Sequence, residues 1–167
     1  MAKMFGATAW KPLLRVVRPL CTRASALSRG ASGYEELLQH NWNGNVIFGA
    51  SAVRQPTTIR ELQEQVKMAE APVRVVGRGH SFSPVVECHG GTLIALGHLN
   101  RVLDFQPPTN GRPGSITVEG GTTYTEVAKF LGQRGALRNL PSCPQFTVAG
   151  AIATGTHGSG VHIPNLA

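Results

Sequence analysis

Two glycine-rich stretches of this sequence carry side chains that could bind or react with a ligand. The first, Gly77-Arg78-Gly79-His80-Ser81, directly follows the apolar segment Val73–Val76. Glycine lets the backbone adopt a positive φ and approach a ligand closely, and successive N–H groups in such a turn can bind phosphate oxygens. His80 adds an imidazole, Arg78 a charge and Ser81 a hydroxyl donor. We expect a ligand-facing turn; the alternative is a turn histidine that bonds only to backbone.

The second stretch, residues 141–160, is rich in small and hydroxyl-bearing residues. Eight of the twelve residues over 149–160 are Gly, Ala or Ser. Such a backbone can lie against a flat, polar ligand and use its N–H groups and threonine hydroxyls. Val148 and Ile152 are interleaved with the small residues, and a solvated linker has no need of them. We therefore predict an ordered ligand-lining segment rather than a flexible linker.

The first stretch also begins like the dinucleotide fingerprint G-x-G-x-x-G. Phe82 stands where the third glycine is required, and Ser83-Pro84 follows without a helical pattern. Because that fingerprint must open a helix at its turn, a Rossmann domain is not expected.

The predicted helices and strands follow an irregular order. A helix over residues 58–71 begins at a capping box, Thr58 with Glu61, and a helix over 122–134 ends at Gly135. Short segments that contain β-branched or aromatic residues predict strands over residues 73–76, 92–96, 102–105 and 115–119. This order indicates an α+β fold rather than a regular βαβ alternation.

Four pieces of the chain together resemble the FAD-binding domain of the vanillyl-alcohol oxidase superfamily: residues 41–45, 74–82, 118–121 and 139–160. Within that superfamily the sugar-alcohol and aldonolactone oxidases look most similar. Residues 147–160 resemble alditol (xylitol) oxidases, and gulonolactone and arabinonolactone oxidases share the layout. The resemblance implies an α+β, PCMH-type FAD-binding domain of two α+β subdomains over residues 35–167. That domain is expected to be truncated at its C-terminal side, with the substrate domain absent.

The resemblance also implies a role for each matched residue. Residues 75–81 would surround the FAD pyrophosphate, and His80 matches the position that bonds covalently to the 8α-methyl carbon of the isoalloxazine. Cys143 is expected to be an ordinary buried thiol rather than a second flavin link. No catalytic residue is expected in this part of the chain. The implied cofactor-binding residues are Val75, Val76, Gly77, Arg78, Gly79, His80, Ser81, Ser142, Thr147, Gly150, Thr154, Gly155, Thr156 and His157.

The implied function is that of the flavin-binding part of an FAD-dependent oxidoreductase. It would act on CH–OH groups of a polyol or sugar lactone with oxygen as acceptor, as alditol oxidases do. One alternative is a D-arabinono-1,4-lactone or L-gulono-1,4-lactone oxidase of ascorbate-type biosynthesis. A second is a non-catalytic flavin-binding remnant. The expected partners are the small-molecule substrate and oxygen, and activity is expected of a longer protein that contains this piece.

Basic charge is concentrated at the N-terminus. Residues 1–34 contain six of the sixteen Lys and Arg side chains and no acid, so ten basic and nine acidic side chains remain elsewhere. The high net charge therefore does not indicate a nucleic-acid-binding surface. Trp10, Leu13, Leu14 and Val17 recur at helical spacing, and serines follow. This pattern is typical of a mitochondrial transit peptide, with a plastid leader as the alternative.

Two further classes are not indicated by the sequence. No apolar run is long enough to span a bilayer. Cys21, Cys88 and Cys143 are far apart and form no C-x-x-C pair, so neither a disulfide framework nor a metal site is expected.

Overall fold

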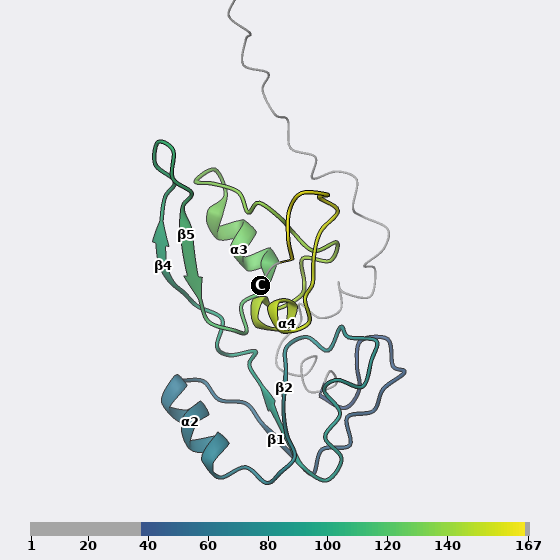
Figure 1. Cartoon of the computed structure of the whole chain (residues 1–167). Helices are drawn as coiled ribbons and strands as arrows, with labels where there is room; N and C mark the ends of the chain where they lie inside the picture. Colours follow the sequence, from purple (N-terminus) through teal and green to yellow (C-terminus); the bar gives the residue numbers. More distant parts are fainter. Residues whose placement is uncertain (1–37, 166–167) are drawn as a thin grey trace, which may run out of the picture.

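The structure, a computed structural model, describes residues 38–165 (Figure 1). The predicted transit peptide and Cys21 lie outside these residues. One half of the molecule carries α2 and a parallel sheet, and the other carries an antiparallel hairpin with α3 and α4, so each half combines helix and strand (Figure 1). The elements are β1 (Ala52–Arg54), α2 (Ile59–Lys67), β2 (Val73–Val76), β3 (Thr92–Ala95), β4 (Val102–Gln106), β5 (Ser115–Val118), α3 (Tyr124–Leu131) and α4 (Val148–Ala153).

The parallel sheet is built around β3. Both β1 and β2 pair with β3 in parallel, on opposite sides of it, and all four β3 residues are buried. Because α2 connects β1 to β2, this half contains a local βαβ connection inside an α+β fold, which the irregular element order did not predict. The core under the sheet is a cluster formed by Leu38, Phe48, Val76, Cys88, Leu93 and Ala95.

Helix α2 begins where the sequence predicted and ends earlier. Thr58 is its N-cap and accepts a hydrogen bond from the Glu61 N–H at 3.1 Å. The Glu61 carboxylate accepts bonds from the N–H and the hydroxyl of Thr57 rather than from Thr58, so the return half of the predicted capping box is displaced by one residue. These bonds lower the pKa of Glu61. The helix ends at Lys67 and buries none of its residues, so the predicted continuation to residue 71 is wrong.

The antiparallel half begins with β4 and β5, which pair around a bulge between Val102 and Asp104. The buried Glu119 carboxylate closes the base of this hairpin: it accepts a bond from Arg101 Nη2 at 2.8 Å and one from the Arg101 backbone N–H at 2.8 Å. These bonds lower the pKa of Glu119. The hairpin is therefore fixed at the point where the chain crosses from one half to the other.

Helix α3 has both halves of a capping box, formed by Thr123 and Glu126. It ends at Gly132, whose φ of +49° places it in the left-handed region that favours glycine, and not at the predicted Gly135. Helix α4, which was not predicted as a helix, lies in the second glycine-rich stretch. Its N-cap Thr147 pairs with Thr123 in an antiparallel bridge, which ties the start of α4 to the start of α3.

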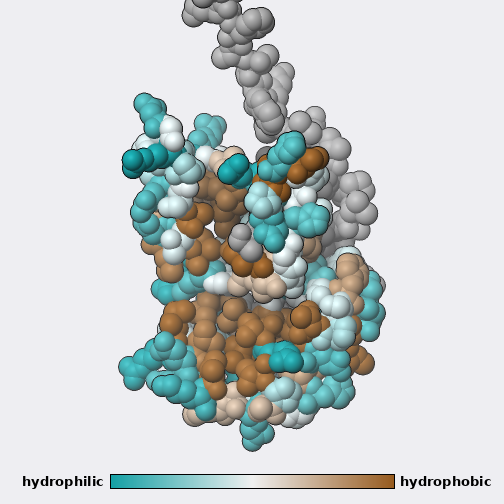
Figure 2. All heavy atoms as spheres, viewed as in Figure 1, coloured by the Kyte–Doolittle hydropathy of each residue, from teal (hydrophilic) through white to brown (hydrophobic). Residues whose placement is uncertain are grey.

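The surface carries apolar area over the half with α2 and the parallel sheet (Figure 2). Exposed apolar side chains of these elements include Ile59, Val66, Val53 and Val75. Among the described helices, none is long and apolar enough to cross a bilayer.

Candidate cofactor-binding site

A cavity of about 280 Å³ lies between the loop that follows β2 and helix α4. It combines glycine backbone, apolar side chains, hydroxyls and one imidazole. The two glycine-rich stretches, which lie far apart in the sequence, therefore form opposite walls of one site. The predicted residues that line it are Val75, Gly77, Arg78, Gly79, His80, Ser81, Thr147, Gly150, Thr154 and Thr156.

Four other predicted residues are absent from this lining. Val76 follows Val75 in the strand, and because successive strand side chains point to opposite faces, Val75 lines the cavity while Val76 packs in the core. Ser142 and His157 are exposed, and the His157 ring bonds to the Gly158 carbonyl at 2.9 Å. Gly155, with a φ of +63°, forms the turn between Thr154 and Thr156.

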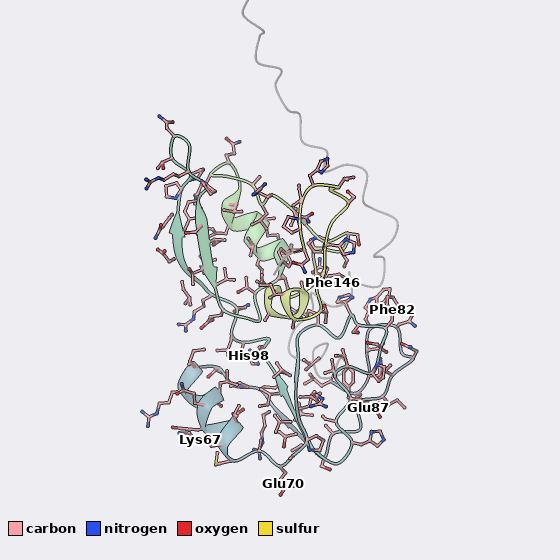
Figure 3. The ribbon with its side chains drawn as sticks, viewed as in Figure 1. Lys67, Glu70, Phe82, Glu87, His98 and Phe146 are labelled. Atoms are coloured by element: carbon pink, nitrogen blue, oxygen red, sulfur yellow. The ribbon has the colours of Figure 1, made fainter. Side chains whose placement is uncertain are left out.

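Five further lining residues were not among the cofactor-binding residues that the resemblance implied. Val85 and Val86 come from the turn after the glycine loop, and Ala151 and Ala153 belong to α4. Phe146 also lines the cavity and belongs to the half that carries α4 (Figure 3). Phe146 directly precedes Thr147 in the second stretch, and this position in the sequence could have predicted that it lines the cavity. Nothing in the spacing of Val85 and Val86 distinguishes them from core residues.

The close approach of the two walls depends on Gly77. A Cβ atom at this position would overlap the Thr147 side chain. Since a Cβ–oxygen overlap of that kind forces one side to move, only glycine lets the loop meet the N-terminus of α4 as it does. Gly79 has a φ of +63° and is buried near the Asn41 backbone and the Phe48 ring, so its place also favours glycine.

His80 is the one imidazole among the described residues that line the cavity. Its half-buried ring contacts Trp42 (ring centroids 5.6 Å apart) and Phe146 (5.0 Å apart). Burial, and secondarily the charge of Arg78, lowers the pKa of His80 to about 4. The imidazole is therefore neutral near pH 7, with a nitrogen lone pair available for bonding.

Hydroxyls gather on the α4 side of the cavity. The Thr154 hydroxyl donates to the Gly150 carbonyl at 2.9 Å and lies 3.2 Å from the Thr156 hydroxyl. Each oxygen keeps lone pairs that can accept from a ligand. On the opposite wall, Ser81 and Ser83 pair their hydroxyls at 3.0 Å.

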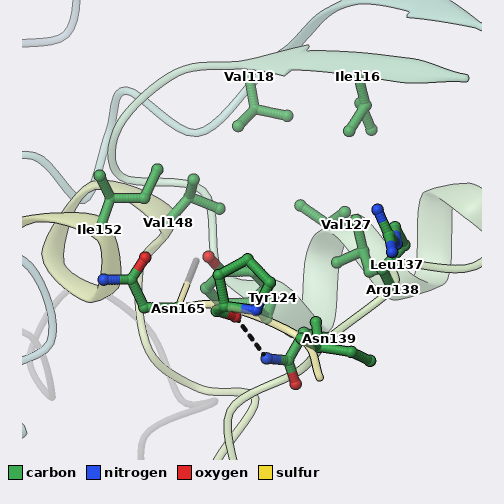
Figure 4. A pocket seen from close by; sticks show the side chains of 12 residues that line it. Ile116, Val118, Tyr124, Val127, Leu137, Arg138, Asn139, Val148, Ile152 and Asn165 are labelled. Atoms are coloured by element: carbon green, nitrogen blue, oxygen red, sulfur yellow. Dashed lines mark hydrogen bonds between the residues drawn. The ribbon is translucent and has the colours of Figure 1, made fainter. Parts of the chain in front are cut away.

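A second cavity, of about 290 Å³, lies between β5, α3 and α4 (Figure 4). Ile116 and Val118 point from the strand toward Val127 and Tyr124 of the helix, and Asn139 bonds to the Pro164 carbonyl at its edge (Figure 4). None of the residues predicted to bind cofactor lines it. We interpret it as loose packing between sheet and helices. Within residues 38–165, no group of three or more His, Cys, Asp or Glu is placed to hold a metal ion.

Comparison with known families identifies the domain. The family described as FAD binding domain matches residues 50–166, and the chain belongs to this family. L-gulono-1,4-lactone dehydrogenase of Mycobacterium tuberculosis is 38% identical over 130 residues, which is 75% of this chain and 29% of that protein. Alditol oxidase of a Streptomyces species is 37% identical over 72% of this chain and 29% of its own length. L-gulonolactone oxidase of Mus musculus is 34% identical over 77% and 29%.

The chain thus spans less than a third of the length of these relatives. Among solved structures, cholesterol oxidase from B. sterolicum superimposes with a TM-score of 0.58 at 19% identity, over 74% of this chain and 24% of that one. At this identity the likeness concerns the fold alone. Together with the family match, it confirms the predicted α+β FAD-binding fold and FAD as the cofactor.

The lining of the β2–α4 cavity fits the chemistry of FAD, which joins a flat ring system, a hydroxylated chain and a pyrophosphate. Val75, Val85 and Ala151 offer apolar contact for rings, and the turn at Gly77 leaves no room for a Cβ beside Thr147. Ligand pockets commonly measure roughly 300–1,000 Å³. The cavity volume of about 280 Å³ lies near the lower end of this range and suits part of an FAD molecule.

Proposed function

We propose that this domain holds FAD between the loop after β2 and helix α4, as the flavin-binding part of an oxidoreductase. The proposed enzyme oxidises CH–OH groups of a polyol or a sugar lactone with oxygen as acceptor. One observation carries the proposal: two glycine-rich segments converge on one cavity that contains a neutral imidazole, in a chain of the FAD binding domain family. Relatives named for alditols and for lactones match at nearly equal identity, which supports both substrate classes alike.

The assignment of residues follows from their chemistry. The N–H groups of Gly77, Gly79 and their neighbours are proposed to bind the pyrophosphate, with the charge of Arg78 nearby. The hydroxyls of Thr154 and Thr156 are proposed to bind polar atoms of the cofactor. Bound FAD supplies the redox chemistry, accepting a hydride from the substrate carbon and passing the electrons to oxygen.

His80 is proposed to attach the cofactor covalently. A ring nitrogen of His80 would form a bond to the 8α carbon of the isoalloxazine, with one hydrogen lost from that carbon and one from the imidazole. The flavin would supply the two-electron oxidant for this bond, and oxygen would carry away the two hydrogens and two electrons as hydrogen peroxide. The neutral, half-buried ring of His80 inside the cavity supports this role.

The test begins with the complete product of the longest transcript that encodes these 167 residues. Peroxide release is measured with xylitol and with L-gulono-1,4-lactone in separate assays. Release with xylitol supports the alditol oxidase function, and release with the lactone alone supports the aldonolactone alternative. If the protein binds FAD but neither substrate reduces the flavin and no peroxide is released, the non-catalytic remnant is indicated instead.

We also propose that residues 1–34 direct the protein to mitochondria, because they are basic, free of acids and contain three serines after an amphipathic segment. A fusion of these residues to a fluorescent protein should accumulate in mitochondria of a eukaryotic host. Plastid accumulation would support the alternative, and a diffuse signal would contradict both.

A further inference from the structure

We propose that Trp42 is a positioning residue for His80: its indole ring fixes the plane of the imidazole from which the bond to flavin forms. The inference rests on the proposed attachment at His80 and gives a role to the 41–45 turn, which has none in the proposed function. It concerns two residues of this chain and their mutual geometry.

The indole and the imidazole are stacked. Their ring centroids are 5.6 Å apart and their planes differ by 29°. Phe146 approaches the same imidazole at 5.0 Å, with its plane tilted by 55°. Within residues 38–165 the His80 ring makes no hydrogen bond. Packing by these two aromatic rings therefore sets its orientation among the described residues.

The backbone around His80 is held by the same turn that carries Trp42. The backbone N–H of Trp42 donates to the Gly79 carbonyl at 2.7 Å, and Asn41 Nδ2 donates to the Ser81 carbonyl at 2.8 Å. Asn41 is 2% exposed. Gly79 is thus bonded to Trp42 and Ser81 to Asn41. These bonds on both sides of His80 hold its imidazole in place relative to the indole.

The turn itself is rigidly bonded. The Asn41 Oδ1 accepts from the Val46 N–H at 3.1 Å, and Asn41 Nδ2 also donates to Asn45 Oδ1 at 2.7 Å. On the exposed side, Phe82 contacts the edge of the Trp42 ring with centroids 6.4 Å apart. Phe82 is 64% exposed and is absent from the cavity lining, so it offers a matched aromatic control whose ring, among the described residues, pairs with Trp42 and not with His80.

A stacked indole has two effects on the attachment step. It limits rotation of the imidazole, which keeps a ring nitrogen directed at one point of the cavity, and reactions are sensitive to such positioning. It also keeps water from one side of the ring, which favours the neutral form that carries the lone pair. Removing the indole should therefore slow attachment and make the imidazole easier to protonate.

The test uses the full chain supplied with FAD. Covalent incorporation over time is followed as flavin fluorescence that stays with acid-precipitated protein. The His80 pKa is measured by NMR titration of the FAD-free chain with ring-labelled histidine. In Trp42→Leu, incorporation should slow by about tenfold or more, as expected for a misplaced nucleophile, and the His80 pKa should rise toward 6.5. Phe82→Leu should match the wild type in both measurements.

Trp42→Leu with wild-type incorporation and an unchanged His80 pKa would overturn the proposal. If circular dichroism shows that this variant does not fold, Trp42→Phe replaces it. Its smaller ring should slow incorporation by about threefold, and wild-type values there would overturn the proposal equally. If the wild type attaches no flavin, the attachment at His80 fails as a proposed function, and the His80 titrations alone decide whether Trp42 positions the ring.

Discussion

The two walls of the cavity are built by different means. The loop after β2 has no regular structure, and distant partners fix it: Asn41 and Trp42 through hydrogen bonds and stacking, and Thr147 through close contact with Gly77. The opposite wall is a short helix that starts at a local cap, with Thr147 accepting from the Gly150 N–H. The imidazole on the irregular loop thus depends on tertiary contacts, whereas the wall of small residues combines a local cap with backbone bonds to the residues at the start of α3. The difference predicts which substitutions affect chemistry and which affect stability.

The largest expected effect comes from the loop. His80→Ala should abolish acid-stable flavin, because no other described residue of the cavity is an imidazole. His162→Ala, which alters an exposed histidine outside the cavity, should retain it. Acid precipitation followed by flavin fluorescence measures both. Covalent flavin in His80→Ala would show that the attachment point lies elsewhere.

The next effect breaks the contact between the two walls. Gly77→Ala introduces a Cβ that overlaps the Thr147 side chain, so we expect a loss of about 2 kcal/mol in the free energy of unfolding. Gly135→Ala is the matched control, since a Cβ there meets no atom within 4 Å and its effect should stay within about 0.5 kcal/mol. Urea unfolding followed by circular dichroism measures both. Equal stability of the two variants would show that the walls do not meet at Gly77.

A smaller effect should follow removal of the helix cap. Thr147→Ala deletes the hydroxyl that accepts from the Gly150 N–H and should cost about 1 kcal/mol. Thr147→Ser keeps the acceptor and should keep most of the stability. The same urea experiment compares them. A serine variant as unstable as the alanine variant would indicate that the threonine methyl, rather than the cap, stabilises α4.

The smallest effect is a pH dependence that arises in the loop. The His80 pKa lies at about 4 in the folded chain and near 6.5 when unfolded, so between these values the unfolded chain binds more protons. The free energy of unfolding should therefore fall as the pH drops from 6.5 toward 4 and should not change through this group above 6.5. The half-buried ring makes the effect modest. His80→Phe should remove this component, and an identical pH dependence in wild type and variant would contradict the assigned pKa.

The sequence predicts the parts of this fold that have strong local signals. Short segments with β-branched or aromatic residues located β2, β4 and β5, and the Thr58–Glu61 pair located the start of α2. Strand β1 has only three residues and is defined by its pairing with β3, so periodicity could not find it. Helix α4 is short, and its Gly and Ala residues give no amphipathic pattern.

In the candidate site, too, some residues are marked by local sequence and others are defined only by tertiary contacts. The glycine turn and the threonines of the second wall are marked by residue type, and most of them line the cavity. The exclusion of Val76 depends on which face of β2 is buried, and the stacking of Trp42 on His80 depends on a contact between distant segments. Cys143 was predicted to be buried but is half-buried. It lies in the loop before α4, and the sequence does not determine the path of that loop. Such facts require the tertiary structure.

Covalent attachment at His80 is tested most directly by locating the flavin on the chain. The protein is produced with FAD available, digested, and its peptides analysed by mass spectrometry with fragmentation. We expect a flavin-modified peptide that contains residues 77–82, with the added mass on His80. Unmodified His80 together with flavin on a different residue, or no flavin on any peptide, would contradict it.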